Sequence, residues 1–90
     1  MIAAATITAG ATAAVIVTAG DTAAEGRDDT LVHNVGAVTA YLGGPDVDTT
    51  DGYPLAAGEV VGLHLLSGDD LYAVTAAETT TELRVLHTRA

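Results

Sequence analysis

The sequence predicts an all-β fold, a small antiparallel β-sandwich or barrel with an extended N-terminal arm or hairpin. From Thr30 to Leu86, short apolar segments follow one another at nearly even spacing, and the stretches between them are rich in Gly, Pro, Asn and Asp. Clusters of β-branched residues near the N-terminus add to this pattern. The strands expected after residue 30 are Leu31–His33, Ala37–Leu42, Val60–Leu66, Leu71–Ala76 and Glu82–Thr88.

The first 20 residues carry no charged side chain and consist almost entirely of Ala, Thr, Gly, Ile and Val. No basic residue precedes this apolar run, Leu is absent from it, and Thr and Gly interrupt it, so we expect neither a signal peptide nor a membrane span. The clusters Thr6–Thr8 and Val15–Thr18 are each followed by Ala-Gly, which favours two short strands ending in turns. Ala3–Ala5 alone would favour helix.

Two arrangements of this N-terminal segment remain open. It is either a first hairpin of the domain core or an arm that leaves the core and docks on a partner subunit, because edge strands of this kind pair readily in both ways. The polar run Asp21–Asp29 is expected to be a linker or long loop. We therefore divide the chain into residues 1–26, the arm or hairpin with its linker, and residues 27–90, the β-sandwich domain.

The turns between the later segments have a specific physical interpretation. Gly43-Gly44-Pro45 ends one strand sharply, and Pro54-Leu55 starts an extended segment that places Leu55 on the core. Gly58-Glu59 then turns the chain into the strand that begins at Val60. Within that strand, alternation places His64 on the face opposite its Leu neighbours, toward solvent or an interface.

The composition predicts a thin core. Alanine dominates the hydrophobic fraction of 49%, Phe and Trp are absent, and there are only three Tyr. Because burying alanine removes little apolar area from water, we expect part of the stability to come from oligomerisation or from docking on a larger assembly. Tyr41 and Tyr72 are the two largest side chains of the strands and are expected to be core or interface anchors.

The charge balance excludes whole classes of partner. The formal net charge is −9, with 12 acidic residues against 3 basic ones. Nucleic acids and anionic membrane surfaces require clustered Lys or Arg, so we expect the protein to bind neither of them. Because cysteine is absent, disulfides and thiolate metal sites are impossible.

The residues available for catalysis are few and scattered. Ser67 lies in a Ser-Gly-Asp-Asp turn, where its hydroxyl is more simply a turn or cap group, and no strand-to-helix elbow accompanies it. The three histidines, His33, His64 and His87, share no metal-binding spacing. We expect no enzymatic activity, no catalytic residues and no cofactor.

The acidic loop after Pro45 carries candidate ligands for a hard cation, Asp46, Asp48 and Asp51. Oxygen ligands at alternate positions suit a hard cation, but the loop departs from the EF-hand pattern, with Asp51 at the required glycine and Ala57 where a bidentate Glu is needed. We expect no metal and interpret the loop as a solvated hairpin turn.

The order of motifs resembles a known family. A strand with Tyr-Leu-Gly-Gly is followed by an acidic loop, Pro-Leu, Ala-Gly-Glu, a strand, Gly-Asp-x-Leu-Tyr-Ala and a last strand with Arg-Val-Leu. This order, which covers roughly Thr30 to Leu86, is similar to that of small structural proteins of tailed phages, often found as capsid decoration or head-associated modules in phages of actinobacteria. The motifs lie in Gly36–Val47, Gly52–Glu59, Gly68–Val74 and Leu83–Leu86.

The resemblance implies a virion structural protein on the outer capsid surface, a cement protein that stabilises the head by bridging major capsid subunits. An acidic protein suits that surface because it is not trapped on packaged DNA. We expect a homotrimer, as on the local three-fold positions of a shell. The alternative is a tail or fibre module that binds a host-surface glycan or another tail protein. The candidate partner-binding residues are Ile7, Val15, Ile16, Val17, Tyr41 and Tyr72.

Overall fold

The computed structural model describes residues 2–18, 27–66 and 69–88, and this part of the chain forms strands joined by turns, without a helix. The predicted all-β class is therefore confirmed. No helix in these ranges has the length and apolarity to cross a membrane. The eight strands are β1 (Ile2–Ala9), β2 (Ala14–Thr18), β3 (Arg27–Asn34), β4 (Ala40–Gly43), β5 (Tyr53–Leu55), β6 (Val60–Leu66), β7 (Asp70–Val74) and β8 (Thr81–Thr88).

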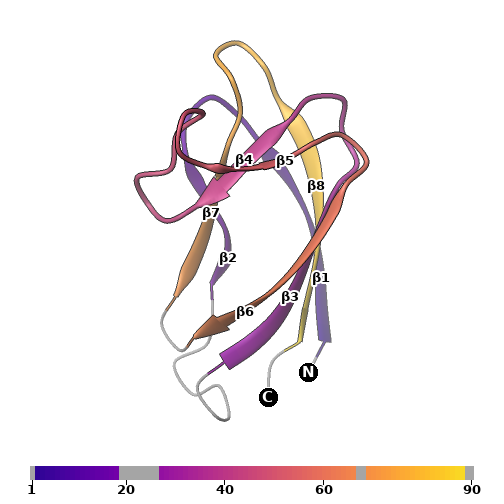
Figure 1. Ribbon diagram of the computed structural model, residues 1–90. Coiled ribbons are helices and arrows are strands. Elements are labelled where there is room, and N and C mark those ends of the chain that lie inside the picture. The colour runs from indigo at the N-terminus through magenta and orange to yellow at the C-terminus, as the bar shows by residue number, and fades with distance from the viewer. Residues whose placement is uncertain (1, 19–26, 67–68, 89–90) are drawn as a thin grey trace.

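The strands form two four-stranded antiparallel sheets packed face to face (Figure 1). Sheet A has the order β1-β8-β3-β6, and sheet B has the order β2-β7-β4-β5. Apart from the β4–β5 hairpin, each strand is followed along the chain by a strand of the other sheet. This arrangement is the eight-stranded double-sheet jelly roll, one of the two architectures that the sequence predicts.

The N-terminal segment forms part of the sandwich. β1 pairs with β8 along its whole length, from Ile2 opposite Thr88 to Ala9 opposite Thr81. β2 lies in the other sheet and pairs with β7, so β1 and β2 do not form a hairpin with each other. The Ala-rich start of β1 is extended despite its helical propensity, because pairing with β8 outweighs a weak local preference.

The boundary of the expected linker also differs from the structure. β3 begins at Arg27, so Asp28 and Asp29 belong to a strand that pairs with β6, where Asp29 lies opposite His64. Residues 21–26 of the expected linker lie outside the described residues. β3 therefore begins earlier than the apolar pattern suggests. Its polar first residues pair through their backbone with β6, and this pairing does not require apolar side chains.

The core is small and aliphatic. β8 shows the alternation most clearly: Thr81, Leu83, Val85 and His87 are buried, while the side chains between them are exposed or half-buried. The largest fully buried apolar side chains are Leu55, Leu83 and Val32. The rest of the buried cluster consists of Ala9, Ile16, Val17, Ala40, Leu42, Leu65, Leu71, Ala73 and Val85.

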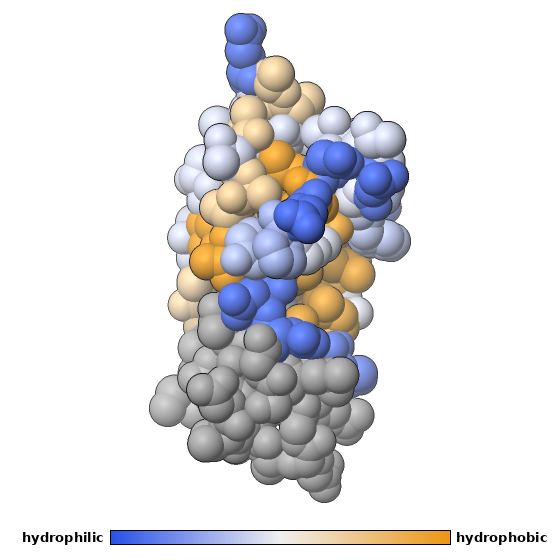
Figure 2. All heavy atoms as spheres, turned by 90° about the vertical axis from the view of Figure 1, so that its left-hand side faces the viewer, coloured by the Kyte–Doolittle hydropathy of each residue, from blue (hydrophilic) through white to orange (hydrophobic). Residues whose placement is uncertain are grey.

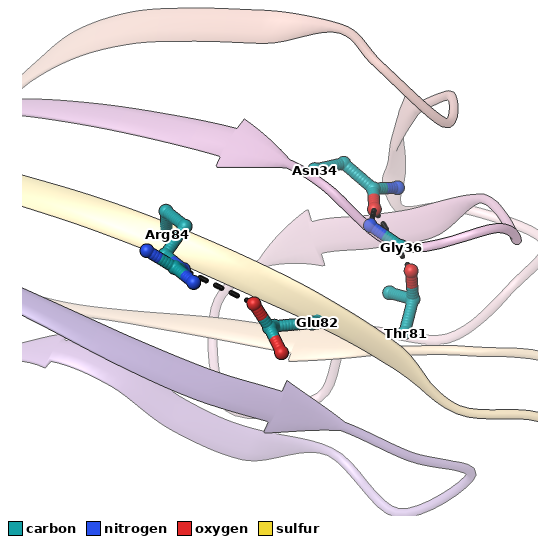
Figure 3. Close-up of polar contacts among 5 residues, drawn as sticks. All are labelled: Asn34, Gly36, Thr81, Glu82 and Arg84. Atoms are coloured by element: carbon teal, nitrogen blue, oxygen red, sulfur yellow. Dashed lines mark hydrogen bonds and ion pairs between the residues drawn. The ribbon is translucent and has the colours of Figure 1, made fainter.

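Asn34, at the end of β3, is a fully buried polar residue. Its side-chain oxygen accepts hydrogen bonds from Thr81 Oγ1 at 2.8 Å and from the Gly36 backbone N–H at 3.1 Å (Figure 3). Its amide nitrogen donates to the carbonyl oxygens of Val38 and Leu55. These contacts hold residues 35–39 in a bend, so the strand expected over Ala37–Leu42 begins only at Ala40.

Candidate functional site

The outer face of sheet A carries a row of exposed apolar residues. The strand registers place Ala4 opposite Leu86, Leu86 opposite Leu31, and Leu31 opposite Gly62, so one line of residues crosses all four strands. Leu31 is 43% and Leu86 44% exposed. We call these four residues the apolar row. Their neighbours Val32 and Val85 are buried, so alternation turns this row toward solvent.

Polar pairs flank the apolar row on both sides. On one side, His64 Nδ1 lies 2.5 Å from a carboxylate oxygen of Asp29, with both side chains exposed. On the other side, Arg84 Nε donates to Glu82 at 3.0 Å (Figure 3). Such exposed pairs contribute little to folding stability, but they fix the polarity of the surface around Leu31 and Leu86.

A second apolar feature lies between the sheets, beside β6. It is a cleft of about 300 Å³. Tyr53 lines this cleft, and 60% of its surface is exposed. The side of the molecule at the left of Figure 1 shows hydrophobic surface interspersed with hydrophilic residues (Figure 2). We call this feature the β6 cleft; its lining residues are Leu42, Gly43, Tyr53, Val61, Leu63 and Leu71.

The N-terminal candidate partner-binding residues do not share one surface. Ile16 and Val17 are 7% and 5% exposed and form part of the core. Two successive residues point inward because β2 is bulged between Val15 and Val17. Val15 is 45% exposed. Ile7, on β1, is half-buried against the core.

The two candidate tyrosines are half-buried on the outer face of sheet B. Tyr72 lies opposite Val15 in the β2–β7 pairing, so these two candidates do come together. Tyr41 lies opposite Val74 and Pro54. A Cβ atom built on Gly52 would stand 2.7 Å from the Tyr41 Cβ, so the acidic loop packs closely against this tyrosine.

The acidic loop uses one of its carboxylates to shape its own backbone. Asp48 Oδ1 accepts hydrogen bonds from the backbone N–H groups of Thr50 at 2.9 Å and Asp51 at 2.8 Å. Asp46, Asp48 and Asp51 are all exposed. Within residues 2–18, 27–66 and 69–88, no group of three His, Asp or Glu side chains is placed to hold a metal ion.

The three histidines lie on sheet A but on different faces. His33 and His64 are on the outer face, and His64 is exposed there, as strand alternation predicts. His87 is 8% exposed and faces inward. Ser67, the one candidate nucleophile, lies outside the described residues. Leu31, Leu86 and Tyr53 are surface residues that were not predicted from the sequence, although alternation with buried neighbours identifies the two leucines.

No family model matches the sequence, and no curated protein matches it at a significant level. Among solved structures, a protein of Bacillus endospore appendages, described as a novel family of disulfide-linked pili, aligns with 99% of this chain and 85% of its own. The identity is 20% and the TM-score 0.61. The present chain has no cysteine, so the disulfide link of that protein has no counterpart here.

A second solved structure with this fold is a sugar phosphate isomerase of the cupin superfamily from Silicibacter pomeroyi, with 12% identity and a TM-score of 0.65. The alignment covers 99% of this chain and 51% of that one, so the chain spans about half of the isomerase's length. The same fold thus occurs in a structural appendage protein and in an enzyme. The fold is compatible with a structural role, and the function has to be inferred from the residues on the surface.

Proposed function

We propose that the protein is a virion structural protein that decorates the outer surface of a tailed-phage capsid and acts without enzymatic activity, metal or cofactor. The observation that carries the proposal is the apolar row, exposed across sheet A of a protein whose formal net charge is −9. The sequence resemblance to phage structural modules supports it. Double-sheet jelly rolls are also frequent in viral capsid domains, which is an argument by analogy.

The apolar row suits docking on a flat protein surface. Leu31 and Leu86 project from the middle two strands of sheet A, and their neighbours in the row, Ala4 and Gly62, are small enough to let a partner surface approach. Complete burial of a leucine contributes about 1.5–3 kcal/mol, and each of these side chains retains less than half of its surface for that purpose. One such contact is weak.

Symmetry would multiply this contact. In the proposal, the protein is a homotrimer on the local three-fold positions of the shell, and each copy presents one apolar row to a major capsid subunit. Multivalent docking converts modest affinities into stable attachment, and separating the bridged subunits then exposes additional apolar surface. The acidic surface keeps the protein off packaged DNA, and no nucleic acid or membrane takes part.

The experiment compares phage particles with and without this protein for retained DNA over a temperature ramp. We expect decorated shells to keep their DNA at temperatures that open bare shells. The variant Leu31→Asp should fail to bind bare shells, whereas Val35→Asp, at a residue of similar exposure (42%) outside the apolar row, should bind normally. Equal DNA retention by the two particle populations would refute the cement role.

Tyr53 favours a second candidate function, a tail or fibre module that binds a host-surface glycan or another tail protein. Its exposed ring stands at the β6 cleft, and a flat aromatic face beside an apolar hollow suits the face of a sugar ring. Recovery of the protein only in tail fractions, together with loss of host-surface binding in Tyr53→Ala, would replace the capsid proposal with this one.

A further inference from the structure

The two sheets differ in how their edge strands are protected against pairing. In sheet B, edge strand β2 is bulged between Val15 and Val17, and edge strand β5 has three residues, one of which is Pro54. A bulge, a short strand and a proline without an N–H all prevent another chain from adding to a sheet. Both edges of sheet B are therefore protected against the addition of another strand.

The edges of sheet A lack every one of these devices. β1 has eight residues and β6 has seven, and neither contains Asp, Glu, Lys, Arg or Pro. Their registers with β8 and β3 run without a bulge. Among the described residues, no further strand pairs with either edge, and neither edge carries an acidic side chain that would repel another copy of this acidic chain.

The incompletely covered part of the core lies at these same edges. Three hydrophobic residues pack against the core yet remain only partly buried: Ile7 on β1, and Val61 and Leu63 on β6. All three face the interior of the sandwich. Val61 and Leu63 also line the β6 cleft, which is open beside this edge. A strand added next to β6 would cover Val61 and Leu63 and place its own inward side chains at the mouth of the cleft.

Strand direction permits that strand to be β1 of a second copy. Because sheet A contains four antiparallel strands, β1 and β6 run in opposite directions. A copy of the sheet placed beside the first therefore continues the antiparallel order across the joint, with β6 next to β1. The two strands also have nearly equal length, so their backbone groups can pair along the whole edge.

We propose that copies of this chain associate head to tail, with the β6 edge of one copy paired to the β1 edge of the next. Ile7 of the second copy then packs at the β6 cleft against Val61 and Leu63. This contact deepens the proposed function by naming the interface within the homotrimer, and it rests on that function only for the number of copies. A heterologous contact of this kind closes into a ring or grows into a filament, as its rotation dictates.

The first test places a lysine on either face of each edge strand of the full chain and measures mass by light scattering after size exclusion. Ala5 is exposed and lies opposite buried Val85, so Ala5→Lys puts a charge on the inner face of β1. Its control, Ala4→Lys, puts the same charge on the outer face. Val61→Lys and Val60→Lys form the matched pair on β6.

We expect the unmodified protein, Ala4→Lys and Val60→Lys to be oligomers, and Ala5→Lys and Val61→Lys to have the mass of a monomer. An equimolar mixture of the two monomeric variants should form a heterodimer, because one contributes an intact β6 edge and the other an intact β1 edge. An oligomer of Val61→Lys would indicate β1–β1 pairing instead and overturn the head-to-tail contact. A monomeric unmodified protein would overturn it too.

A second measurement decides the case in which a lysine variant fails to fold, as judged by circular dichroism. The chain has no cysteine, so the double variant Ala5→Cys/Val61→Cys carries one thiol on each edge. A short bismaleimide should convert it into a ladder of linked chains, and each single-cysteine variant should give no ladder. Absence of the ladder overturns the proposal. Purified protein that is monomeric yet binds bare shells would overturn this contact and leave the capsid function standing.

Discussion

The side-chain amide nitrogen of Asn34 donates a hydrogen bond of 2.9 Å to the backbone carbonyl oxygen of Leu55. This contact joins the last residue of β3 in sheet A to the last residue of β5 in sheet B. The same nitrogen donates to the Val38 carbonyl, and the amide oxygen accepts from Thr81 and Gly36. A side-chain amide has two donor hydrogens and two acceptor lone pairs, and Asn34 uses all four.

Replacing Asn34 with alanine should destabilise the fold by at least about 3 kcal/mol, because several buried polar groups lose their partners and each costs about 1–3 kcal/mol. For a domain of this size, the melting temperature should fall by roughly 12 °C or more. Thermal unfolding followed by circular dichroism measures the change. Asp51→Ala, in the exposed loop, is the control and should melt within a few degrees of the parent protein.

A glycine is required at position 36 because the neighbouring atoms leave no room for a side chain. A Cβ atom at this position would lie 1.9 Å from Thr81 Oγ1 and 2.6 Å from the Glu82 backbone nitrogen. Gly36→Ala should therefore disrupt the bend and leave little folded protein, as measured by the dispersion of amide proton resonances. Gly44→Ala introduces the same methyl group where no atom lies within 4 Å, and it should fold normally.

Glu78 adopts a φ of 65°, in the left-handed region that L side chains disfavour. Glu78→Gly should relieve this strain and raise the free energy of unfolding by roughly 1 kcal/mol, as measured by urea titration. The neighbouring exposed residue provides the comparison: Ala77→Gly should lower the free energy of unfolding, because there the added backbone freedom relieves no strain. Equal effects of the two substitutions would argue against strain at Glu78.

The acidic loop should fold without a cation, because the Asp48 carboxylate already holds the turn through two backbone N–H groups. A chelator should leave the melting temperature unchanged. Asp48→Ala should cost about 1 kcal/mol, whereas Asp48→Asn keeps the accepting oxygen and should cost less. A chelator-dependent drop of several degrees would identify Asp46, Asp48 and Asp51 as ligands.

Deleting residues 1–18 should leave a chain that does not fold. The deletion removes both N-terminal strands, with Ile7, Ala9, Ile16 and Val17 among the residues that cover the core. The measurement is the near-ultraviolet circular dichroism and solubility of the shortened protein. A soluble, cooperatively melting product would mean instead that the segment is an arm that can leave the body of the protein.

The sequence was sufficient for the fold class because turn residues and strand-length apolar segments are local signals. It could not assign partners to the strands, since β1 pairs with β8 at the other end of the chain and no local pattern encodes that distance. Asn34 illustrates the same limit. In the sequence it has the form of a turn residue, and only the approach of Leu55 and Thr81 makes it a buried link between the sheets.

The candidate surface also has a part that local alternation predicts and a part that depends on tertiary structure. Alternation correctly turned His64 outward, and it contains enough information to place Leu31 and Leu86 there. The bulge in β2 breaks alternation, which is why Ile16 and Val17 enter the core together. The β6 cleft depends on how far the two sheets lie apart beside β6, a property of packing that no single segment carries.

β8 pairs on one side with β1 and on the other with β3, so the middle of sheet A is completed by the strand that leaves the ribosome last of the eight. Until β8 has been synthesised, the backbone groups of β1 lack their partner strand and its apolar residues are exposed. Folding through such distant pairings is slow and exposes the nascent chain to aggregation. The rate at which the protein accumulates in an expressing cell should therefore depend on temperature and chaperone supply, and release of β8 from the ribosomal tunnel should be the step that commits the chain to its native state.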